Sequence, residues 1–258
     1  MEPNNKQIGW GRPLWAEIDL DALAHNIGEL KRQARGALLT AVVKANAYGH
    51  GAATVARAAL ATGAERLAVI CVDEGEQLRR AGITAPILIM GHSPSADARR
   101  IVELQLTPTV NSREIALALA TAAADEGITQ PIHLKVDTGL GRYGLPPTEL
   151  IVLAEALREV PSLAIEGLFT HFAAADEGDK GYTRKQYESF LAVAERLSWI
   201  PLRHASNTAT LLDMPEMNLD LVRPGIGIYG CYPSAQVNRN VELRPVLSLK
   251  SRVVRLTR

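Results

Sequence analysis

The chain has 258 residues, of which 47% are hydrophobic and 22% are charged, a balance that is typical of globular proteins and excludes a fibrous or disordered chain. Its 28 Lys and Arg residues balance 28 Asp and Glu residues, so no net charge favours binding to nucleic acid or to an anionic membrane surface. No apolar run is long enough to span a bilayer, and residues 1–13 lack the apolar segment of a secretory signal.

The first predicted elements follow this polar stretch, residues 1–13, which we expect to be disordered. Apolar residues then alternate with polar ones, which predicts a half-buried strand: Leu14, Ala16, Ile18 and Leu20. Three further apolar residues have the spacing of a helix: Leu23, Ile27 and Leu30.

Eight short apolar runs then alternate with amphipathic stretches, which is the pattern of βα units around a parallel sheet. The predicted strands are Leu38–Val43, Leu67–Val72, Ile87–Met90, Leu106–Val110, Ile132–Val136, Ile165–Phe169, Leu202–Ser206 and Leu221–Ile228. Eight such repeats in a chain of this length predict an α/β fold, a TIM-like (β/α)8 barrel.

Two helices between these strands have clear signals. Apolar residues at helical spacing are Leu150, Leu153, Ala154 and Leu157 in one helix, and Tyr187, Phe190, Leu191, Ala194 and Leu197 in the other. Thr183 and Gln186 have the spacing of a capping box, which predicts that the second helix begins there.

The end of the chain lies outside the barrel repeats. Pro245–Arg258 has the partly alternating pattern of a strand. Because a lone apolar edge strand promotes aggregation, we assign this segment and the strand at Leu14 to a second, mostly β unit. We therefore expect a barrel at residues 14–240 and the start of a C-terminal β domain, mostly missing, at residues 241–258.

Cys71 and Cys231 lie far apart, each in an apolar run, where a free Cys behaves as a small hydrophobic residue. This usage fits the reducing conditions of the cytoplasm, where we expect the protein to reside.

Polar residues gather at the predicted C-terminal ends of the strands, where (β/α) barrels carry their active sites. They are Lys44, Lys135, Asp137, His171, His204, Asn207, Thr208, Arg223 and Gly225. Each alone has an ordinary structural explanation, such as a Lys at the rim or a His in the core, but together they predict one site. The six His residues are scattered and no metal-ligand spacing occurs, so we expect no metal.

Lys44 lies in the segment Ala41-Val-Val-Lys-Ala-Asn-Ala-Tyr-Gly-His-Gly51, where apolar surroundings would disfavour its charged form. Such a Lys is nucleophilic towards an aldehyde and suits a Schiff base. Tyr48 begins the following loop and would either reach a phosphate or pack in the core. The loops after the last two strands, Ser206-Asn-Thr208 and Gly225-Ile-Gly227, are where barrels commonly bind phosphate.

Two segments, Gly139–Gly144 and Gly225–Gly230, match the pattern G-x-G-x-x-G. Two matches in one chain show how weak this pattern is. Pro146 and Pro147 also keep a helix from starting at the second glycine of the first match, so we do not predict dinucleotide binding.

Besides the segment around Lys44, four stretches match motifs of one known family in the family's order. They are His133-Leu-Lys-Val-Asp-Thr-Gly-Leu-Gly-Arg142, Thr170-His-Phe-Ala-Ala-Ala-Asp-Glu177, His204-Ala-Ser-Asn-Thr208 and Val222-Arg-Pro-Gly-Ile226. On these residues the chain resembles bacterial alanine racemase over essentially its whole length. The resemblance implies an isomerase that uses pyridoxal 5'-phosphate to interconvert L-alanine and D-alanine, which supplies D-alanine for peptidoglycan.

The resemblance also implies roles for individual residues around the cofactor ring. Lys44 would hold the cofactor and transfer the α-proton on one face of the substrate. Arg223, supported by His204, would bind the pyridine nitrogen and leave it unprotonated, because a guanidinium does not give up its proton. The side chain of His171 would pack beside the ring.

The remaining implied contacts are to the substrate and the phosphate. Arg142 would contact the cofactor phenolate and the substrate carboxylate, and Lys135, a carbamylated residue in this family's pattern, would hold Arg142 in place. The phosphate would be held by Tyr48, Thr208, Gly225 and Ile226, with Asn207 as a further cofactor-binding residue. Thr208 stands where the family often has Ser.

Racemisation needs a proton-transferring group on both faces of the substrate. The family takes the second group, a Tyr, from the β domain of the partner subunit, which implies a homodimer for the full-length protein. No Tyr follows Val246 in this sequence, so the sequence predicts cofactor binding and leaves turnover open.

Three alternatives stay open at this point. A single-barrel protein that carries pyridoxal phosphate without catalysis has a similar lysine strand, but the strand Leu14–Leu20 and the tail Pro245–Arg258 argue against it. A racemase for serine or another amino acid would share these motifs, whereas Arg223 disfavours a decarboxylase, which needs an acidic partner at the pyridine nitrogen. The third alternative is a fragment of a larger protein, even of a membrane-anchored racemase.

Overall fold

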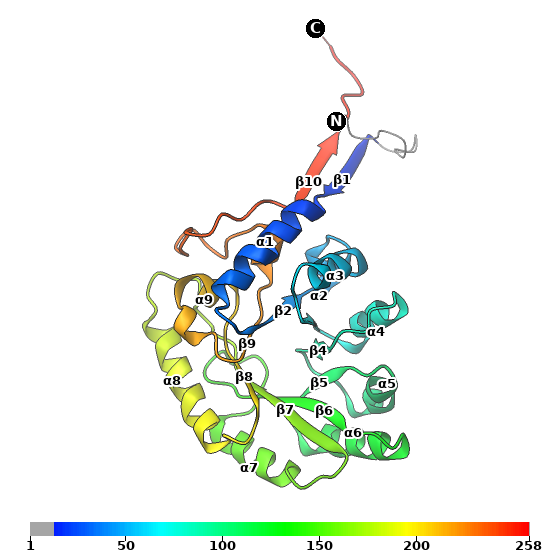
Figure 1. Ribbon diagram of the computed structural model, residues 1–258, viewed down its shortest axis with the longest axis vertical. Helices are drawn as coiled ribbons and strands as arrows, with labels where there is room; N and C mark the ends of the chain where they lie inside the picture. The colour runs from blue at the N-terminus through cyan, green and yellow to red at the C-terminus, as the bar shows by residue number, and fades with distance from the viewer. Residues whose placement is uncertain (1–12, 258) are drawn as a thin grey trace.

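The computed structural model describes residues 13–257, so the predicted disorder at residues 1–13 lies, except for Pro13, outside the described residues. Eight parallel strands form a nearly closed barrel with helices around it, as predicted (Figure 1). The barrel strands are β2 (Leu38–Val42), β3 (Arg66–Val69), β4 (Ile87–Ile89), β5 (Thr107–Val110), β6 (Gln130–Lys135), β7 (Leu163–Phe169), β8 (Leu202–His204) and β9 (Leu221–Val222).

The strands pair in the order β8-β7-β6-β5-β4-β3-β2-β9. Between the two end strands, the backbone N–H of Asp220 donates to Arg203 at 3.0 Å, and that of Arg223 donates to Ser206 at 3.0 Å. These two bonds bring β9 back beside β8, which places the loops that follow β2, β7, β8 and β9 at one mouth of the barrel.

Except for the short α2 (Lys44–Tyr48) at the mouth, the helices cover the outside of the barrel and bury their apolar sides against the strands. They are α1 (Leu20–Gln33), α2 (Lys44–Tyr48), α3 (Ala52–Ala61), α4 (Val72–Arg80), α5 (Ala98–Glu103), α6 (Arg113–Asp125), α7 (Pro147–Leu157), α8 (Gly181–Arg196) and α9 (Thr208–Asp213), with 3-10 turns η1 (Ser95–Asp97), η2 (Pro215–Met217) and η3 (Ile226–Tyr229). Within residues 13–257, no helix combines the length and the apolar character that a membrane crossing requires.

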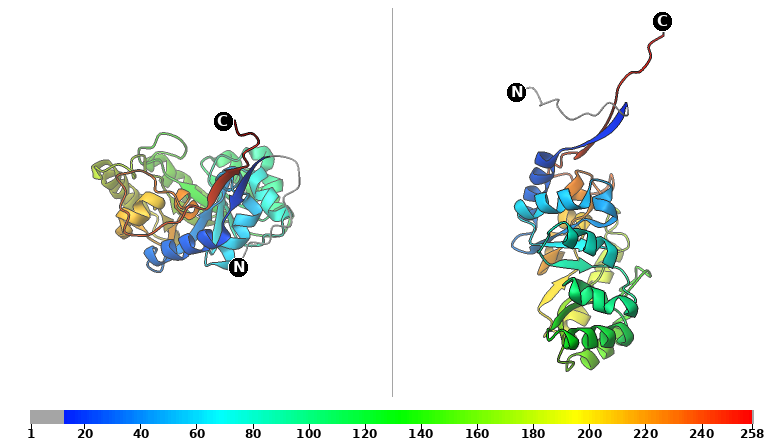
Figure 2. Two further views of the ribbon diagram at one scale, coloured as in Figure 1. Left: turned by 90° about the horizontal axis from the view of Figure 1, so that it is seen from above. Right: turned by 90° about the vertical axis from the view of Figure 1, so that its right-hand side faces the viewer.

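A two-stranded antiparallel ribbon projects from the α1 end of the barrel (Figures 1 and 2). It pairs β1 (Leu14–Ile18) with β10 (Leu247–Ser251). The predicted strand at Leu14 is confirmed, but its predicted half-burial is wrong, because Leu14 is 54% exposed and no second layer of described residues covers the ribbon. The chain after Ser251 continues without regular structure to residue 257, which shortens the predicted strand Pro245–Arg258.

Predicted helix faces agree with the structure except at Leu191, and one predicted helix start does not. The residues predicted to pack are buried in α1 and α7, whereas Leu191 on α8 is 39% exposed. The capping box is wrong: α8 begins at Gly181, and Thr183 and Gln186 are both buried on its inner face.

The last predicted strand, Leu221–Ile228, is also wrong in extent. Only Leu221 and Val222 are paired, because Pro224 has no N–H to donate to a sheet and η3 follows from Ile226. Cys71 is partly buried and Cys231 is exposed, so only the first fits the expected role of a small hydrophobic residue.

Candidate active site

Two adjoining cavities, of about 170 and 430 Å³, lie at the C-terminal ends of the strands. The larger is within the range of roughly 300–1,000 Å³ that is typical of small-molecule sites. Both cavities are lined by Lys44, Tyr48, Met90, His171 and Arg223. The smaller adds Asn207, Thr208, Gly225 and Ile226, and the larger adds Lys135 and Arg142. The structure therefore brings the predicted site residues to one mouth except His204, which lies behind Arg223, and Asp137, which lines neither cavity.

Lys44 is presented by an unusual backbone turn. The four residues that follow it have the positive φ angles of a left-handed helix: Ala45 (51°), Asn46 (53°), Ala47 (55°) and Tyr48 (53°). The sequence offered no signal for this turn, because Ala and Tyr seldom adopt positive φ. The predicted loop that begins at Tyr48 is thus a left-handed turn that begins directly after Lys44.

Glu74, on α4, holds the start of this turn in place. Its carboxylate accepts the backbone N–H of Ala45 at 2.7 Å and that of Ile70 at 2.8 Å. At the other end of the turn, the side-chain oxygen of Asn46 accepts the N–H of Ala52 at 2.8 Å. Glu74 was not among the predicted site residues, because its position on a neighbouring helix has no marker in the sequence.

The amine of Lys44 lies 5.8 Å from the ring centre of Tyr48. Burial lowers the pKa of Lys44, the positive charge of Arg142 lowers it further, and the carboxylate of Glu74 opposes both effects. A larger fraction of neutral amine is the condition for nucleophilic attack on an aldehyde.

Arg223 is 3% exposed, and its guanidinium is held from within the barrel. One nitrogen lies 2.5 Å from Nδ1 of His204, and another donates to the carbonyl oxygens of Thr170 at 2.8 Å and Ala205 at 3.2 Å. Burial lowers the pKa of Arg223 to about 9, which leaves it charged at neutral pH. No carboxylate within residues 13–257 forms an ion pair with it.

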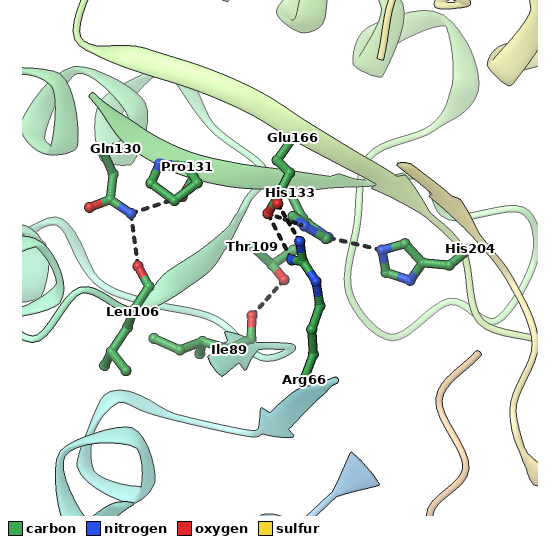
Figure 3. A network of polar contacts seen from close by, with 9 residues as sticks. All are labelled: Arg66, Ile89, Leu106, Thr109, Gln130, Pro131, His133, Glu166 and His204. Carbon is green, nitrogen blue, oxygen red and sulfur yellow. Dashed lines mark hydrogen bonds and ion pairs between the residues drawn. The ribbon is translucent and has the colours of Figure 1, made fainter. Parts of the chain in front are cut away.

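Behind Arg223, a chain of polar side chains continues through the barrel interior from His204 to His133, Glu166 and Arg66 (Figure 3). His133 and His204 are almost completely buried. Sequence reasoning identified His204 and missed the other three, since nothing in their spacing indicates that they meet.

Thr208 organises the backbone between β9 and η3. Its hydroxyl oxygen accepts the N–H of Gly225 at 3.1 Å and that of Gly227 at 3.3 Å. A Cβ at position 225 would lie only 2.7 Å from the hydroxyl oxygen of Tyr48. The glycine thus lets the hydroxyl group of Tyr48 lie close to the backbone, where the hydroxyl group of Thr208 also makes contact.

The loop that carries Arg142 is folded around the carboxylate of Asp137. That carboxylate accepts the backbone N–H groups of Gly139, Leu140 and Gly141 at 2.9–3.1 Å. Burial acts to raise the pKa of Asp137, but these three bonds outweigh it and hold the pKa below its usual value. Arg142 itself is exposed at the edge of the larger cavity.

Lys135 lies beneath this loop, 3% exposed, and donates to the carbonyl oxygen of Tyr143. Burial lowers its pKa to about 8; the charges of Arg142 and Arg223 add to this effect, and Asp137 opposes it. The larger cavity is therefore bordered by four basic side chains, Lys44, Lys135, Arg142 and Arg223, which favours an anionic ligand.

His171 follows β7 and stays neutral. Burial lowers its pKa to about 3, and the surrounding positive charges contribute. Gln186, the residue wrongly predicted to cap α8, accepts the N–H of Ala173 at 2.9 Å and donates to the hydroxyl oxygen of Thr138 at 3.3 Å. It therefore fixes the segment after His171 from the buried side of α8.

Comparisons with known proteins found similar sequences and similar structures. The family model for the N-terminal domain of alanine racemase matches residues 18–233. The alanine racemase of Desulfosudis oleivorans is 46% identical over 94% of this chain and 66% of its own length, and that of Clostridium tetani is 45% identical over 95% and 65%. The chain thus spans about two thirds of the length of these relatives.

Solved structures are similar over the same extent. Alanine racemase of Clostridium difficile in complex with cycloserine has a TM-score of 0.92 and 37% identity, over 95% of this chain and 70% of that one. The enzyme of Bacillus anthracis with bound L-Ala-P has a TM-score of 0.85 and 38% identity, over 93% and 64%.

Proposed function

The chain belongs to the alanine racemase family, and we propose that it binds pyridoxal 5'-phosphate at the mouth of its barrel and transfers the α-proton of alanine there. One observation carries this proposal: Lys44 lines the same cavity as Arg223, Thr208 and Gly225. An amine, a fixed cation and a small cradle of hydroxyl and N–H groups match the aldehyde, the ring nitrogen and the phosphate of that cofactor.

The residues present fit the group. The hydroxyl groups of Tyr48 and Thr208, which both lie against Gly225, support a phosphate at this end of the cavity, with Asn207 and Ile226 along its border. Lys44 and Arg223 line the same cavity as these residues, which supports a ring held by the amine and bound by the guanidinium. His171 is neutral and only partly exposed, which suits packing against a ring.

When bound, pyridoxal phosphate supplies an electron-withdrawing ring that makes the α-proton of an attached amino acid acidic. The protein supplies position and charge. Lys44, with its lowered pKa, is able to accept this proton at its Nζ on one face of the substrate and return it. Arg223 stays protonated and would donate to the ring nitrogen without transferring a proton to it.

The substrate carboxylate would be oriented by Arg142. This residue lies on the exposed side of the larger cavity, on the loop ordered by Asp137, where an amino acid would enter. Lys135, with its pKa of about 8, is neutral in part near neutral pH, the form that reacts with carbon dioxide, and we propose that its carbamate would pair with Arg142.

The second proton-transferring group would come from elsewhere. We propose that residues 14–240 are the cofactor-binding barrel, that residues 241–258 begin a second, β domain, and that a homodimer of the full-length protein completes the site. The product would then be D-alanine for peptidoglycan, made in the cytoplasm.

The test follows loss of the α-proton from L-alanine and D-alanine separately, in heavy water with pyridoxal phosphate. Exchange of at least one enantiomer, lost in Lys44→Ala but kept in the matched variant Lys185→Ala on the exposed side of α8, is the expected result. Interconversion of both enantiomers would show that a second group is present. Cofactor bound to Lys44 with no exchange of either enantiomer would refute the proposal and favour a carrier protein, and faster exchange of serine would reassign the substrate.

A further inference from the structure

The polar side chains behind Arg223 form a continuous series of hydrogen bonds from Arg66 to Arg223. Two nitrogens of Arg66 donate to the two carboxylate oxygens of Glu166 at 3.0 and 2.5 Å. Oε2 of Glu166 lies 3.2 Å from Nε2 of His133, whose Nδ1 lies 2.9 Å from Nε2 of His204. Nδ1 of His204 faces Arg223 at 2.5 Å. Figure 3 shows these side chains, except Arg223, between β3, β6, β7 and β8.

Arg223 at one end and Glu166 at the other determine which ring nitrogen of His204 and His133 carries the proton. Arg223 has only donors, so Nδ1 of His204 has to be an acceptor and its proton sits on Nε2. That proton is donated to Nδ1 of His133, which leaves the proton of His133 on Nε2, pointing at Glu166. A carboxylate accepts it, and only a pair of neutral Nε2–H imidazoles satisfies every contact.

The charge states of the two histidines and of Glu166 agree with this assignment of protons. Burial lowers the pKa of His133 and lowers that of His204 well below its usual value, so both rings are neutral near pH 7. Although burial acts to raise it, hydrogen bonds from His133 and Arg66 lower the pKa of Glu166 to about 2, which keeps it an acceptor.

The surrounding fold is built to hold the two rings. A Cβ at Gly167 would come within 2.5 Å of the His133 ring, and the pairing of β6 with β7 shifts register between Ile132 and His133. On the other side, the ring of Phe169 stacks on that of His204 with 4.7 Å between centres and a 6° angle, and the guanidinium of Arg223 lies 5.2 Å from the Phe169 ring centre.

We propose that Glu166 is a positioning residue of the active site: through the tautomers of His133 and His204, it presents an unprotonated nitrogen to Arg223 and so aims the guanidinium at the cavity. The effect on catalysis rests on the proposed function, whereas the tautomers themselves do not. If His204 carried its proton on Nδ1, two donors would face each other at His204 and Arg223, and the guanidinium would turn away. A proton on Nδ1 of His133 would oppose the Nε2–H of His204 and so drive the His204 proton to Nδ1.

The first test needs no cofactor. The ring nitrogens of the full chain are observed by 15N NMR in wild type, in Glu166→Gln and in the control Asp220→Asn. Asp220 also pairs with an arginine, Arg203, at 3.0 Å, but has no contact with the histidines. Wild type and Asp220→Asn are expected to show Nε2–H tautomers at His133 and His204. In Glu166→Gln, where the amide also donates, a mixture with Nδ1–H is expected.

Two results would overturn the proposal. One is a proton on Nδ1 of His204 in wild type, which needs no variant to fold. The other is a folded Glu166→Gln whose tautomers match those of wild type.

The second test measures α-proton exchange with pyridoxal phosphate. Glu166→Gln is expected to lose roughly 10- to 100-fold in exchange rate, by analogy with the loss of partners that orient metal-bound imidazoles. Its affinity for the cofactor phosphate should change little, because that contact lies elsewhere. A rate equal to that of Asp220→Asn would contradict the role of Glu166. If wild type itself shows no exchange, the proposed function fails, and the tautomers alone decide the positioning role.

Discussion

The left-handed turn after Lys44 predicts that an Ala→Gly substitution, which usually destabilises a protein, increases stability here. Ala45 is exposed and has a φ of 51°, a conformation that costs an L-residue with a Cβ roughly 1–2 kcal/mol. Replacing it by Gly removes that penalty. The gain is reduced by the greater freedom of Gly in the unfolded chain, roughly 0.4–1 kcal/mol. We therefore expect Ala45→Gly to raise the free energy of unfolding by about 0.5–1 kcal/mol.

The matched control is the same substitution in a right-handed helix. Ala192 is also exposed, but it lies inside α8, where Ala→Gly lowers stability by about 1 kcal/mol. The two variants thus differ only in the hand of the backbone at the substituted position. The free energy of unfolding should be higher than that of wild type for Ala45→Gly and lower for Ala192→Gly.

The assay is urea-induced unfolding followed by circular dichroism, with the shift of the midpoint read at an unchanged slope. The Ala45→Gly midpoint should lie above that of wild type and the Ala192→Gly midpoint below it. If both substitutions destabilise by similar amounts, Ala45 does not hold a strained backbone, and the reasoning about the turn is wrong.

Three further predictions concern the site. Asp137→Ala should free the loop that carries Arg142 and raise the KM for alanine more than the dissociation constant of pyridoxal phosphate; equal changes in steady-state kinetics and cofactor titration would contradict this. Thr208→Val leaves the buried N–H of Gly225 unpaired and should weaken cofactor binding roughly 10-fold in an absorbance titration, and unchanged affinity would rule out a phosphate there. Burial and the charge of Arg142 lower the pKa of Lys44, so the rate at which Lys44 reacts with the cofactor aldehyde should rise with pH and level off below about pH 10.4, the usual pKa of Lys. A rate that levels off only above that pH would argue against the lowered pKa.

The barrel was predictable from the sequence because each buried strand of a parallel sheet is a short apolar run between amphipathic helices. The order and number of the strands followed from that pattern alone. The extent of β9 did not, because Leu221–Ile228 is apolar throughout and only the backbone chemistry of Pro224 and Gly225 separates a two-residue strand from a 3-10 turn.

The site was predictable where a residue lies within two positions after a strand, as Lys44, His171 and Arg223 do. Residues that act on these from other elements were not. Glu74 reaches the turn from α4, and Gln186 was assigned to a helix cap although it lies inside α8. Their roles depend on which surfaces meet in space, and local spacing does not report that.

The polar chain inside the barrel shows the same limit. His133, Glu166 and Arg66 lie on three different strands, and each in isolation has the pattern of a strand residue. Only the closed barrel brings them into contact. Polar residues in otherwise apolar strands therefore indicate an internal network, but their partners follow only from the strand order and register.

The ribbon of β1 and β10 has a consequence for how the chain folds. It joins Leu14 to Ser251, so it resembles a hairpin whose connecting turn is the entire barrel. Loop-closure entropy grows only with the logarithm of length, about 0.6 kcal/mol for each doubling, but it is lost before such a distant contact forms. Once the barrel has folded, the bond from the Asp19 N–H to the Val246 carbonyl, 2.8 Å long, sets the two strands side by side. The ribbon should therefore form after the barrel during folding and separate before it during unfolding, as a distinct cooperative unit.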